Sequence, residues 1–268
     1  MIRLMCAPTY FDIEYSINPW MNVAVKVNKA LAFEQWHHFI DVLKELGDTV
    51  EMIEPMPGLP DMTFAGDGGL VVDRTFIPSN FRNQERRGES AHYAHWFKQR
   101  GFNIVRMPDD VFFEGLGDVV FHDRRAIVGH GRRSDARSIE HLKRIVPDLH
   151  ILGDLHIRDD RYFHLAMALG FIDADTLLYY PEAFDEDGVR RLSSMVKYPI
   201  ALSDKDANEY FACNNLVIGD TVLMDNCTAG LRGALAERGY QVTTCDMSEF
   251  KKSGGSLRCL VLSFIEQP

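Results

Sequence analysis

A cysteine follows a glycine-rich turn close to the C-terminal end of the sequence. Gly254 and Gly255 stand shortly before Cys259, and the apolar residues 260–262 come directly after it. Two adjacent glycines allow a sharp turn or a close backbone approach that a Cβ would block. The apolar run predicts a strand over 257–264 with Cys259 at its entrance. Cys259 is a candidate nucleophile because thiolates are strongly nucleophilic, and the alternative is a small buried core cysteine.

Other side chains capable of chemistry recur at equivalent points of a repeated pattern. They stand just before or at the start of each predicted hairpin, and they are Asp67, Glu114, Asp118, His164, Cys213 and Asn214. Taken singly, such acids are typical of turns and solvated surfaces, and a histidine is more often structural than catalytic. Their recurrence at matching points predicts that they converge on one cavity.

Attack on a guanidinium carbon is the reaction that needs this set of groups. Carboxylates accept paired hydrogen bonds from a planar guanidinium, and the bound cation favours a thiolate at Cys259. His164 can then protonate the departing amine and later help water attack a covalent amidino-thioether. We therefore expect a small cationic guanidino substrate and no metal or organic cofactor.

The repeat itself is regular along the chain. Predicted hairpins start near positions 69, 117, 165 and 214, which are 48, 48 and 49 residues apart, and a helix and a strand follow each hairpin. Such a period is typical of repeat architectures. The predicted units are 70–72 with 75–78, 90–100 and 103–107; 117–120 with 126–129, 137–146 and 150–152; 165–171 with 176–180, 186–196 and 199–202; and 215–218 with 221–224, 229–238 and 241–244.

The two ends of the sequence predict a fifth unit. The final strand, 257–264, has no hairpin partner after it, and a predicted N-terminal strand at 3–8 can supply one, followed by helix 30–46 and strand 49–53. Closing the units into a ring removes exposed sheet edges. The sequence therefore predicts an α/β fold, a five-bladed α/β propeller of ββαβ units closed by the N-terminal strand, as a single catalytic domain over 1–268. An open α/β sheet is the alternative.

Composition excludes several classes of protein. The formal net charge of -10 argues against nucleic-acid binding, which needs basic surface. No apolar run is long enough to cross a membrane and no signal peptide is evident, so we expect no membrane association and a cytoplasmic protein. Five cysteines without a CxxC spacing suit a reducing compartment and argue against a disulfide framework or a zinc ribbon. No motif indicates the oligomeric state, and a homo-oligomer stays open.

Two further patterns resemble ligand sites only superficially. His92 and His95 have a spacing that places them on one helix face, but no third residue is spaced to complete a metal site. The segment 66–69 is rich in glycine, yet it lacks the Lys-Ser/Thr pair of a phosphate-binding loop. We expect neither a metal nor a nucleotide.

Four motifs in order make the chain resemble the guanidine-modifying enzyme superfamily of arginine deiminases, dimethylarginine dimethylaminohydrolases and amidinotransferases. They are Leu-Pro-Asp-Met-Thr-Phe at 59–64 with Asp67, Phe-Glu-Gly-Leu-Gly-Asp at 113–118, Phe-His-Leu at 163–165, and the Gly-Gly pair ahead of Cys259. The resemblance implies a pentein fold, a propeller of five ββαβ blades. It further implies Cys259 as nucleophile, His164 as general acid/base, Glu114 as its partner on the guanidinium and Asp67 as the main guanidinium clamp. Asp61 and Asp118, within the same motifs, are candidate substrate-binding residues.

Segments 4–8, 17–21 and 211–214 look most like the catalytic domain of arginine dihydrolases. This similarity suggests Arg86 and Arg133 as a clamp for a substrate α-carboxylate, with Asn18 as a weaker substrate contact. Taken without the resemblance, both arginines are typical exposed surface charges.

Three positions depart from the family patterns. Asp67 stands where dihydrolases carry Asn, Gly66 replaces the Glu that dimethylargininases place there, and Ala166 stands where many deiminases and amidinotransferases have Asp. We expect a wider and less negative pocket beside Gly66. The resemblance implies a hydrolase that converts arginine or an N-methylated arginine to citrulline plus ammonia or an alkylamine. The alternatives are a dihydrolase that yields ornithine, an amidinotransferase that uses an acceptor amine, and a non-enzymatic arginine-binding protein.

Overall fold

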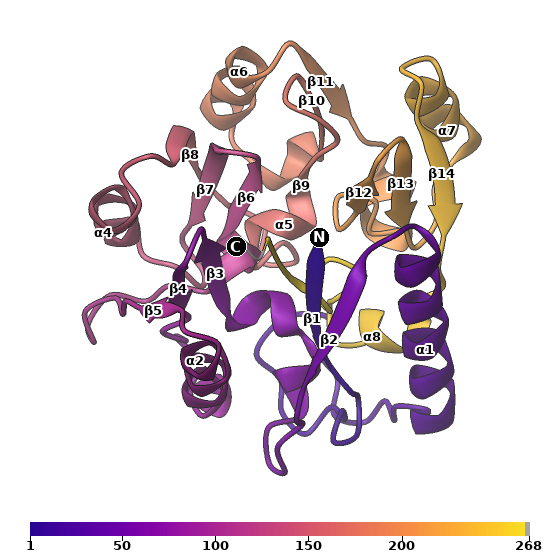
Figure 1. The fold of residues 1–268 in the computed structure, drawn as a ribbon. Helices are drawn as coiled ribbons and strands as arrows, with labels where there is room; N and C mark the ends of the chain where they lie inside the picture. The colour runs from indigo at the N-terminus through magenta and orange to yellow at the C-terminus, as the bar shows by residue number, and fades with distance from the viewer. Residues whose placement is uncertain (266–268) are drawn as a thin grey trace.

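Five small three-stranded sheets surround a common centre in the computed structural model, which describes residues 1–265 (Figure 1). In four of them an antiparallel hairpin is joined by a third strand parallel to its second strand. These blades are β3 (Gly69–Val72), β4 (Thr75–Pro78) and β5 (Asn103–Ile104); β6 (Val119–His122), β7 (Arg125–His130) and β8 (His150–His156); β9 (Leu169–Phe171), β10 (Thr176–Tyr179) and β11 (Tyr198–Ala201); and β12 (Leu216–Ile218), β13 (Thr221–Met224) and β14 (Gln241–Thr244). The predicted ββαβ repeat is confirmed.

The fifth blade joins the two ends of the chain. Strand β15 (Leu262–Phe264) pairs antiparallel with β1 (Ile2–Cys6), which runs parallel to β2 (Thr49–Ile53). Leu4 lies between Leu262 on one side and Glu51 on the other. The N-terminal strand thus closes the ring, as the sequence predicts, and the open-sheet alternative is wrong.

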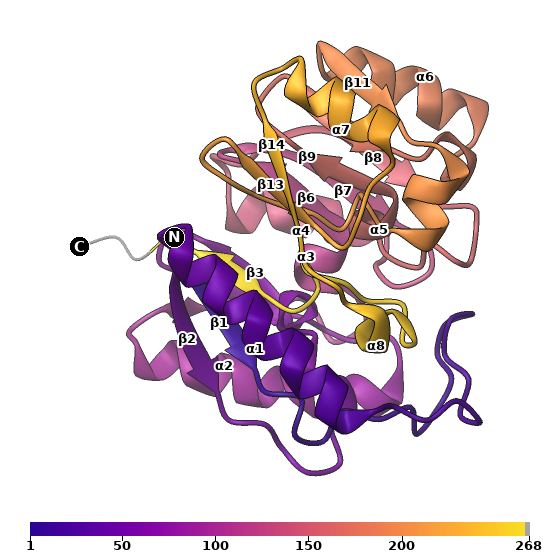
Figure 2. The same ribbon diagram turned by 90° about the vertical axis from the view of Figure 1, so that its right-hand side faces the viewer.

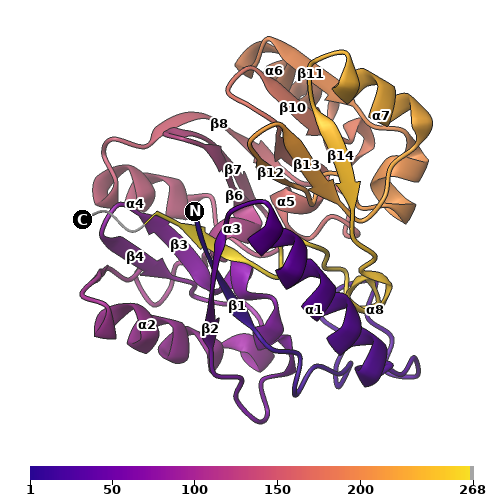
Figure 3. The ribbon, with the colours of Figure 1, turned by 45° about the vertical axis from the view of Figure 1, so that its right-hand side comes forward.

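One helix of each blade covers its sheet on the outside of the ring (Figures 1 and 3). These helices are α1 (Lys29–Glu45), α2 (Glu89–Gln99), α4 (Arg137–Ile145), α6 (Glu186–Met195) and α7 (Ala229–Ala236). Helix α1 begins where the side chain of Asn28 accepts a hydrogen bond from the Leu31 amide, and it buries Trp36, Phe39 and Leu43 at helical spacing. A further turn, α8 (Ser248–Lys251), contacts α1. No helix within residues 1–265 is long and apolar enough to span a membrane.

Short helical turns precede the innermost strands, and two predicted strand boundaries are wrong because of them. A 3₁₀ turn occupies Ala65–Gly68, and one-turn helices α3 (Gly115–Asp118) and α5 (Leu165–Ala168) occupy the matching points of the next two blades. The predicted strands 117–120 and 165–171 therefore begin at 119 and 169. The backbone carbonyls of Glu114 and His164 close these turns by accepting hydrogen bonds from Gly117 and Met167.

The predicted strand 257–264 is also wrong over its first half. Leu260 and Val261 donate backbone hydrogen bonds to Leu257 and Arg258, so this segment is a turn, and the strand begins only at Leu262. Cys259 therefore lies in a turn before a strand rather than at the entrance of one.

Candidate active site

Each of the five blades contributes one polar residue from the corresponding point of its inner edge. Asp67 comes from the 3₁₀ turn, Glu114 and His164 stand immediately before α3 and α5, Asn214 precedes β12, and Cys259 precedes β15. All five side chains are buried, with at most 5% of any of these residues exposed. The short turns bring these groups, up to 192 positions apart in sequence, toward the axis of the ring.

The imidazole of His164 lies between two carboxylates. Its Nε2 is 2.8 Å from Glu114 Oε2, and its Nδ1 is 3.6 Å from Asp67 Oδ1. Gly117 packs on the ring so closely that a Cβ there would lie 2.8 Å from the imidazole Cγ. Burial lowers the pKa of His164, but the carboxylates of Asp67, Glu114 and Asp118 outweigh burial and raise it. The ring is therefore held in place and favoured as an imidazolium that can donate a proton.

Two amides donate to the sulfur of Cys259, the backbone N–H of Ser256 and the side chain of Asn214. Asn214 Nδ2 donates a hydrogen bond to Sγ over 3.2 Å, and the Cys259 amide donates to Asn214 Oδ1 over 3.3 Å. Burial, together with the nearby charge of Asp67, raises the pKa of Cys259 to about 12. The unliganded site therefore holds a neutral thiol at neutral pH, and a bound cation is needed to favour the thiolate.

Arg86 is fixed by two acids and an aromatic ring. Its Nη1 donates to Asp67 Oδ2 over 2.6 Å, while its Nε and Nη2 donate to the two oxygens of Glu89 over 2.8 and 2.9 Å. The guanidinium lies 4.6 Å from the centre of the Phe81 ring. Only 3% of Arg86 is exposed, so the expectation of an ordinary surface charge is wrong.

Arg133 makes the matching ion pair with the other acid. Its Nη1 donates to Glu114 Oε2 over 2.9 Å, its Nη2 donates to the Ile17 carbonyl, and its guanidinium lies 4.7 Å from the centre of the Phe163 ring. Burial alone raises the pKa of Glu114, but the charge of Arg133 and the hydrogen bond of His164 outweigh burial and lower it well below its usual range. Glu114 is therefore a carboxylate shared by Arg133 and His164.

These groups meet at a nearly closed cavity. The predicted residues in its wall are Asn18, Asp61, Asp67, Arg86, Arg133 and Cys259, and Phe64, Phe163 and Gly254 are among the others. The cavity encloses only about 10 Å³ of free volume, which is the space of one water molecule. An arginine-sized ligand therefore requires the walls to move apart.

The remaining predicted residues lie around this cavity. Glu114 and His164 are behind its wall, next to Arg133 and Asp67. Asp118 is also outside the wall, where its Oδ1 accepts a hydrogen bond from the Leu165 amide over 3.0 Å. No group of three or more His, Cys, Asp or Glu side chains within the described part of the chain could hold a metal ion.

Several buried polar atoms at the site lack hydrogen-bond partners among residues 1–265, and three of them belong to the predicted acid and base groups. These three are Asp61 Oδ1, Asp67 Oδ1 and His164 Nδ1. The other oxygen of Asp61 accepts from the Tyr15 hydroxyl over 3.0 Å, and the other oxygen of Asp67 is held by Arg86. Asp67 Oδ1 lies 3.6 Å from His164 Nδ1, beyond hydrogen-bond distance. Buried polar atoms are normally satisfied, so these two carboxylate oxygens, which accept no hydrogen bond from the described residues, indicate a ligand that donates hydrogen bonds.

Glu89 and Tyr15 also belong to the site, although no motif singles them out, and Asn214, predicted to lie at the cavity, contacts the sulfur. Glu89 holds Arg86 from three residues away in the sequence, and that Arg–Glu spacing was the only local signal for it. The repeat predicts that Asn214 lies at the cavity, but no feature of the sequence predicts its contact with the sulfur. Tyr15 lies in an irregular segment with no pattern that predicts its contact with Asp61.

The expected widening beside Gly66 is absent. The Gly66 amide donates to the Cys259 carbonyl over 2.8 Å. A Cβ on Gly66 would lie 2.7 Å from the Arg258 carbonyl oxygen and 3.1 Å from that of Cys259. Gly66 therefore brings the backbone of the first blade against the cysteine turn, and the backbone fills the space that was expected to be open.

Comparisons with known proteins agree with this arrangement. The sequence model of the family described as "N,N dimethylarginine dimethylhydrolase, eukaryotic" matches residues 8–266. The N(G),N(G)-dimethylarginine dimethylaminohydrolase of Mycobacterium tuberculosis is 33% identical over 96% of this chain and 84% of its own length. The bifunctional arginine dihydrolase/ornithine cyclodeaminase ArgZ of Synechocystis is 34% identical over 98% of this chain.

The chain spans only 37% of the length of that bifunctional relative. A solved structure of the N-terminal domain of an ArgZ variant, covalently bound to a reaction intermediate, superposes with a TM-score of 0.93 at 33% identity, covering 99% of this chain and 98% of that one. This likeness supports the pentein fold of five blades seen in Figure 1. On the extent of the family match, the chain belongs to the dimethylarginine dimethylaminohydrolase family of the guanidine-modifying enzyme superfamily.

Proposed function

We propose that the chain is a cysteine-dependent amidine hydrolase. It cleaves the guanidinium C–N bond of arginine or an N-methylated arginine and releases citrulline with ammonia or an alkylamine. The observation that carries the proposal is the buried cavity at which the Cys259 thiol, the Asp67 carboxylate and two arginines meet, with His164 directly behind. Because all five blades contribute a group, we propose that the chain acts as one catalytic domain.

Substrate binding follows from the free atoms of the cavity. Asp61 Oδ1 and Asp67 Oδ1, which accept no hydrogen bond from the described residues, accept hydrogen bonds from the substrate guanidinium, and Glu114 lies behind them as a further negative charge. Arg86 and Arg133 then face the α-carboxylate, held rigid by Glu89 and by aromatic rings. Asn18 donates to the Ser253 carbonyl over 3.1 Å and thereby joins two segments that line the cavity; it serves as a weaker contact to the substrate.

Catalysis begins when the bound cation favours loss of the Cys259 proton to solvent water, which leaves the thiolate. The sulfur attacks the guanidinium carbon, and a tetrahedral adduct forms. The C–N bond breaks as the departing amine takes a proton from His164, which leaves a positively charged amidino-thioether. His164 then removes a proton from water, the hydroxide adds to the same carbon, and the C–S bond breaks to give citrulline and Cys259.

Arginine dihydrolase activity is the second candidate. The close superposition with the N-terminal domain of ArgZ favours it, whereas Asp67, where the dihydrolase pattern has Asn, favours a single hydrolysis that stops at citrulline. Asp67→Asn also removes a negative charge that opposes the thiolate of Cys259. On this reasoning the variant shifts products from citrulline toward ornithine, and an unchanged ratio would remove Asp67 as the determinant.

The test is mass spectrometry of the products from arginine, monomethylarginine and asymmetric dimethylarginine. We expect citrulline plus the corresponding amine from at least one substrate, with no acceptor amine present. Turnover that needs glycine, lysine or ornithine as acceptor would indicate amidino transfer instead. A thermal shift with arginine but no product from any of the three substrates would contradict the enzymatic assignment.

A further inference from the structure

A second, larger cavity opens at the opposite end of the central strands. It has a volume of about 440 Å³, and Met1 and Ile265 line it. Asp67, in the wall of the first cavity, precedes β3, and Asp73, in the wall of the second, follows it. Figure 2 shows the N-terminus on one side of the molecule and the segment before α1, part of which lines the active site, on the other. The two cavities therefore face away from each other along the axis of the ring.

The second cavity contains an uncompensated cation. Arg258 lines it, its Nε is buried, and no hydrogen bond or ion pair to its guanidinium is present within residues 1–265. The neighbouring Arg3 is already held by Asp48 and Ser263. Arg258 is half-buried, and even partial burial of a guanidinium without a counter-ion is costly, so this position favours an anionic group.

A free acceptor lies in the same wall. Asn215 is 1% exposed, and its Nδ2 donates to the carbonyls of Ala212 and Cys213. This fixes the orientation of the amide and directs Oδ1 away from those carbonyls, and Oδ1 has no partner among the described residues. A ligand that satisfies Arg258 and Asn215 together needs an anionic group and a hydrogen-bond donor.

Most of the remaining wall is apolar, including Val71, Leu116, Phe171, Val217 and Val261. The other charged groups are already engaged: Asp73 pairs with Arg124, the Met1 α-ammonium lies 3.4 Å from Asp48, and Asp123 lies 3.5 Å from His122. Pockets of a few hundred Å³ with apolar walls and few polar groups are typical of small-molecule sites. We propose that this cavity binds a small carboxylate with an apolar body and a neighbouring donor, the chemistry of an apolar α-amino acid or 2-hydroxy acid.

The same residues connect the two cavities. Arg258 precedes Cys259 directly, Asn215 follows Asn214, and the Arg258 amide donates to the Asn214 carbonyl over 3.4 Å. The positive charge of Arg258 favours the thiolate of Cys259, and a bound carboxylate neutralises that charge. The ligand is therefore an inhibitor that acts from the far side of the cysteine turn; this consequence, unlike the binding itself, rests on the proposed function.

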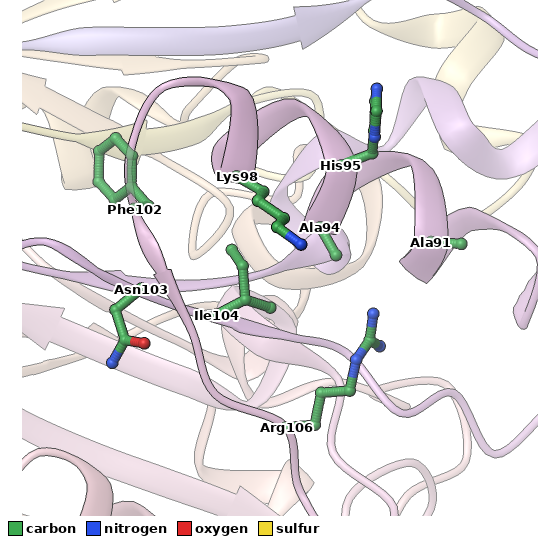
Figure 4. Close-up of a pocket in the computed structure, with 8 residues that line it drawn as sticks. All are labelled: Ala91, Ala94, His95, Lys98, Phe102, Asn103, Ile104 and Arg106. Atoms are coloured by element: carbon green, nitrogen blue, oxygen red, sulfur yellow. The ribbon is translucent and has the colours of Figure 1, made fainter.

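Calorimetric titration with 3-phenylpropionate, 3-phenyllactate, L-phenylalanine and 2-phenylethylamine tests the binding without any turnover. We expect the three carboxylates to bind and 2-phenylethylamine, which has no carboxylate, not to bind. 3-Phenyllactate and L-phenylalanine should bind more than tenfold tighter than 3-phenylpropionate, because each carries a donor for Asn215 Oδ1. Arg258→Met should weaken carboxylate binding at least tenfold. The matched control is Arg106→Met, in an exposed basic pocket between α2 and β5 that also contains Lys98 (Figure 4), and it should change nothing.

Titrations of Cys259→Ser, which should not turn arginine over, in the presence of excess arginine exclude binding at Arg86 and Arg133. Carboxylate binding that persists in Arg258→Met, or that arginine displaces competitively, would overturn the proposal. Val217→Phe, which fills the cavity without removing a charge, replaces Arg258→Met if that variant does not fold, and it should abolish binding. Binding without inhibition would overturn the regulatory part alone, whereas absence of turnover in the unliganded protein would count only against the proposed function.

Discussion

Asn214 and Cys259 exchange two hydrogen bonds: the asparagine amide donates to the cysteine sulfur over 3.2 Å, and the cysteine backbone amide donates to the asparagine oxygen over 3.3 Å. The two residues come from adjacent blades and are both buried. The exchange fixes the position of the sulfur and supplies a donor that stabilises negative charge on it. Asn214 is therefore a positioning residue for the nucleophile.

Replacement of this asparagine should slow the reaction by disfavouring the thiolate. We expect Asn214→Ala to lower kcat by about tenfold, the loss of one hydrogen bond to a charged group. Asn214→Asp should lower it further, because it places an acceptor and a negative charge beside the sulfur. The readout is kcat together with the pH profile of Cys259 alkylation, and Asn103→Ala, exposed on β5, is the control. An unchanged alkylation profile in both variants would show that Asn214 has only a structural role.

The high pKa of Cys259 predicts a distinctive pH dependence of alkylation. Only the thiolate reacts with iodoacetamide, and below the pKa its fraction rises about tenfold for each pH unit. With a pKa raised to about 12 by burial and by Asp67, the labelling rate should still be rising steeply at about pH 9. Closure of the cavity lowers the absolute rate but leaves this slope unchanged. A plateau near neutral pH would mean that the unliganded site already holds a thiolate.

Glu89 should act through Arg86. Three charge-assisted hydrogen bonds fix the Arg86 guanidinium, two to Glu89 and one to Asp67. Glu89→Gln removes the charge of Glu89 and one of its two hydrogen bonds, so Arg86 binds a substrate carboxylate in a less defined position. We expect KM to rise about tenfold with a smaller change in kcat. Steady-state kinetics with arginine measures this, and Glu140→Gln, at an exposed ion pair on α4, is the control. A loss confined to kcat would remove Arg86 from substrate binding.

Gly66→Ala should destabilise the fold at the cysteine turn. The added Cβ meets backbone oxygens of Arg258 and Cys259 at 2.7 and 3.1 Å, and relieving such overpacking costs about 1–3 kcal/mol. We expect Tm to fall by several degrees, by roughly 2–4 °C per kcal/mol, with a parallel loss of activity. Gly233→Ala on α7 meets no atom within 4 Å and should leave Tm unchanged or slightly raised. Equal Tm values for the two variants would contradict the close packing at Gly66.

The period of the sequence was sufficient to predict the five blades and the strand that closes them. Each hairpin repeats the same alternation, and ring closure is the arrangement that leaves no sheet edge exposed. The one-turn helices at Gly115–Asp118 and Leu165–Ala168 were not predictable, because tertiary packing rather than helix propensity stabilises four residues. For the same reason the turn that holds Cys259 was mistaken for a strand.

Most residues of the site could be predicted because they have reactive side chains at equivalent positions of the repeat. The contacts that could not be predicted join segments that are distant in sequence. Tyr15 reaches Asp61 across 46 positions, and Asn214 reaches Cys259 across 45. Neither contact has a local pattern. The wider pocket expected beside Gly66 is absent for a similar reason. A glycine leaves free space only where no neighbouring backbone fills it, and backbone oxygens of the cysteine turn fill it here.

The proposed mechanism requires a covalent bond between Cys259 and the substrate. Intact-protein mass spectrometry of samples that are acid-quenched during turnover detects this bond directly. With the preferred guanidino substrate, the wild-type protein should gain the mass of the substrate less its leaving amine, and peptide mapping should locate the addition at Cys259. Cys259→Ser should show neither the adduct nor citrulline. Sustained citrulline formation by Cys259→Ser, or turnover by the wild type with the adduct on another residue, would contradict the assignment of Cys259 as the nucleophile.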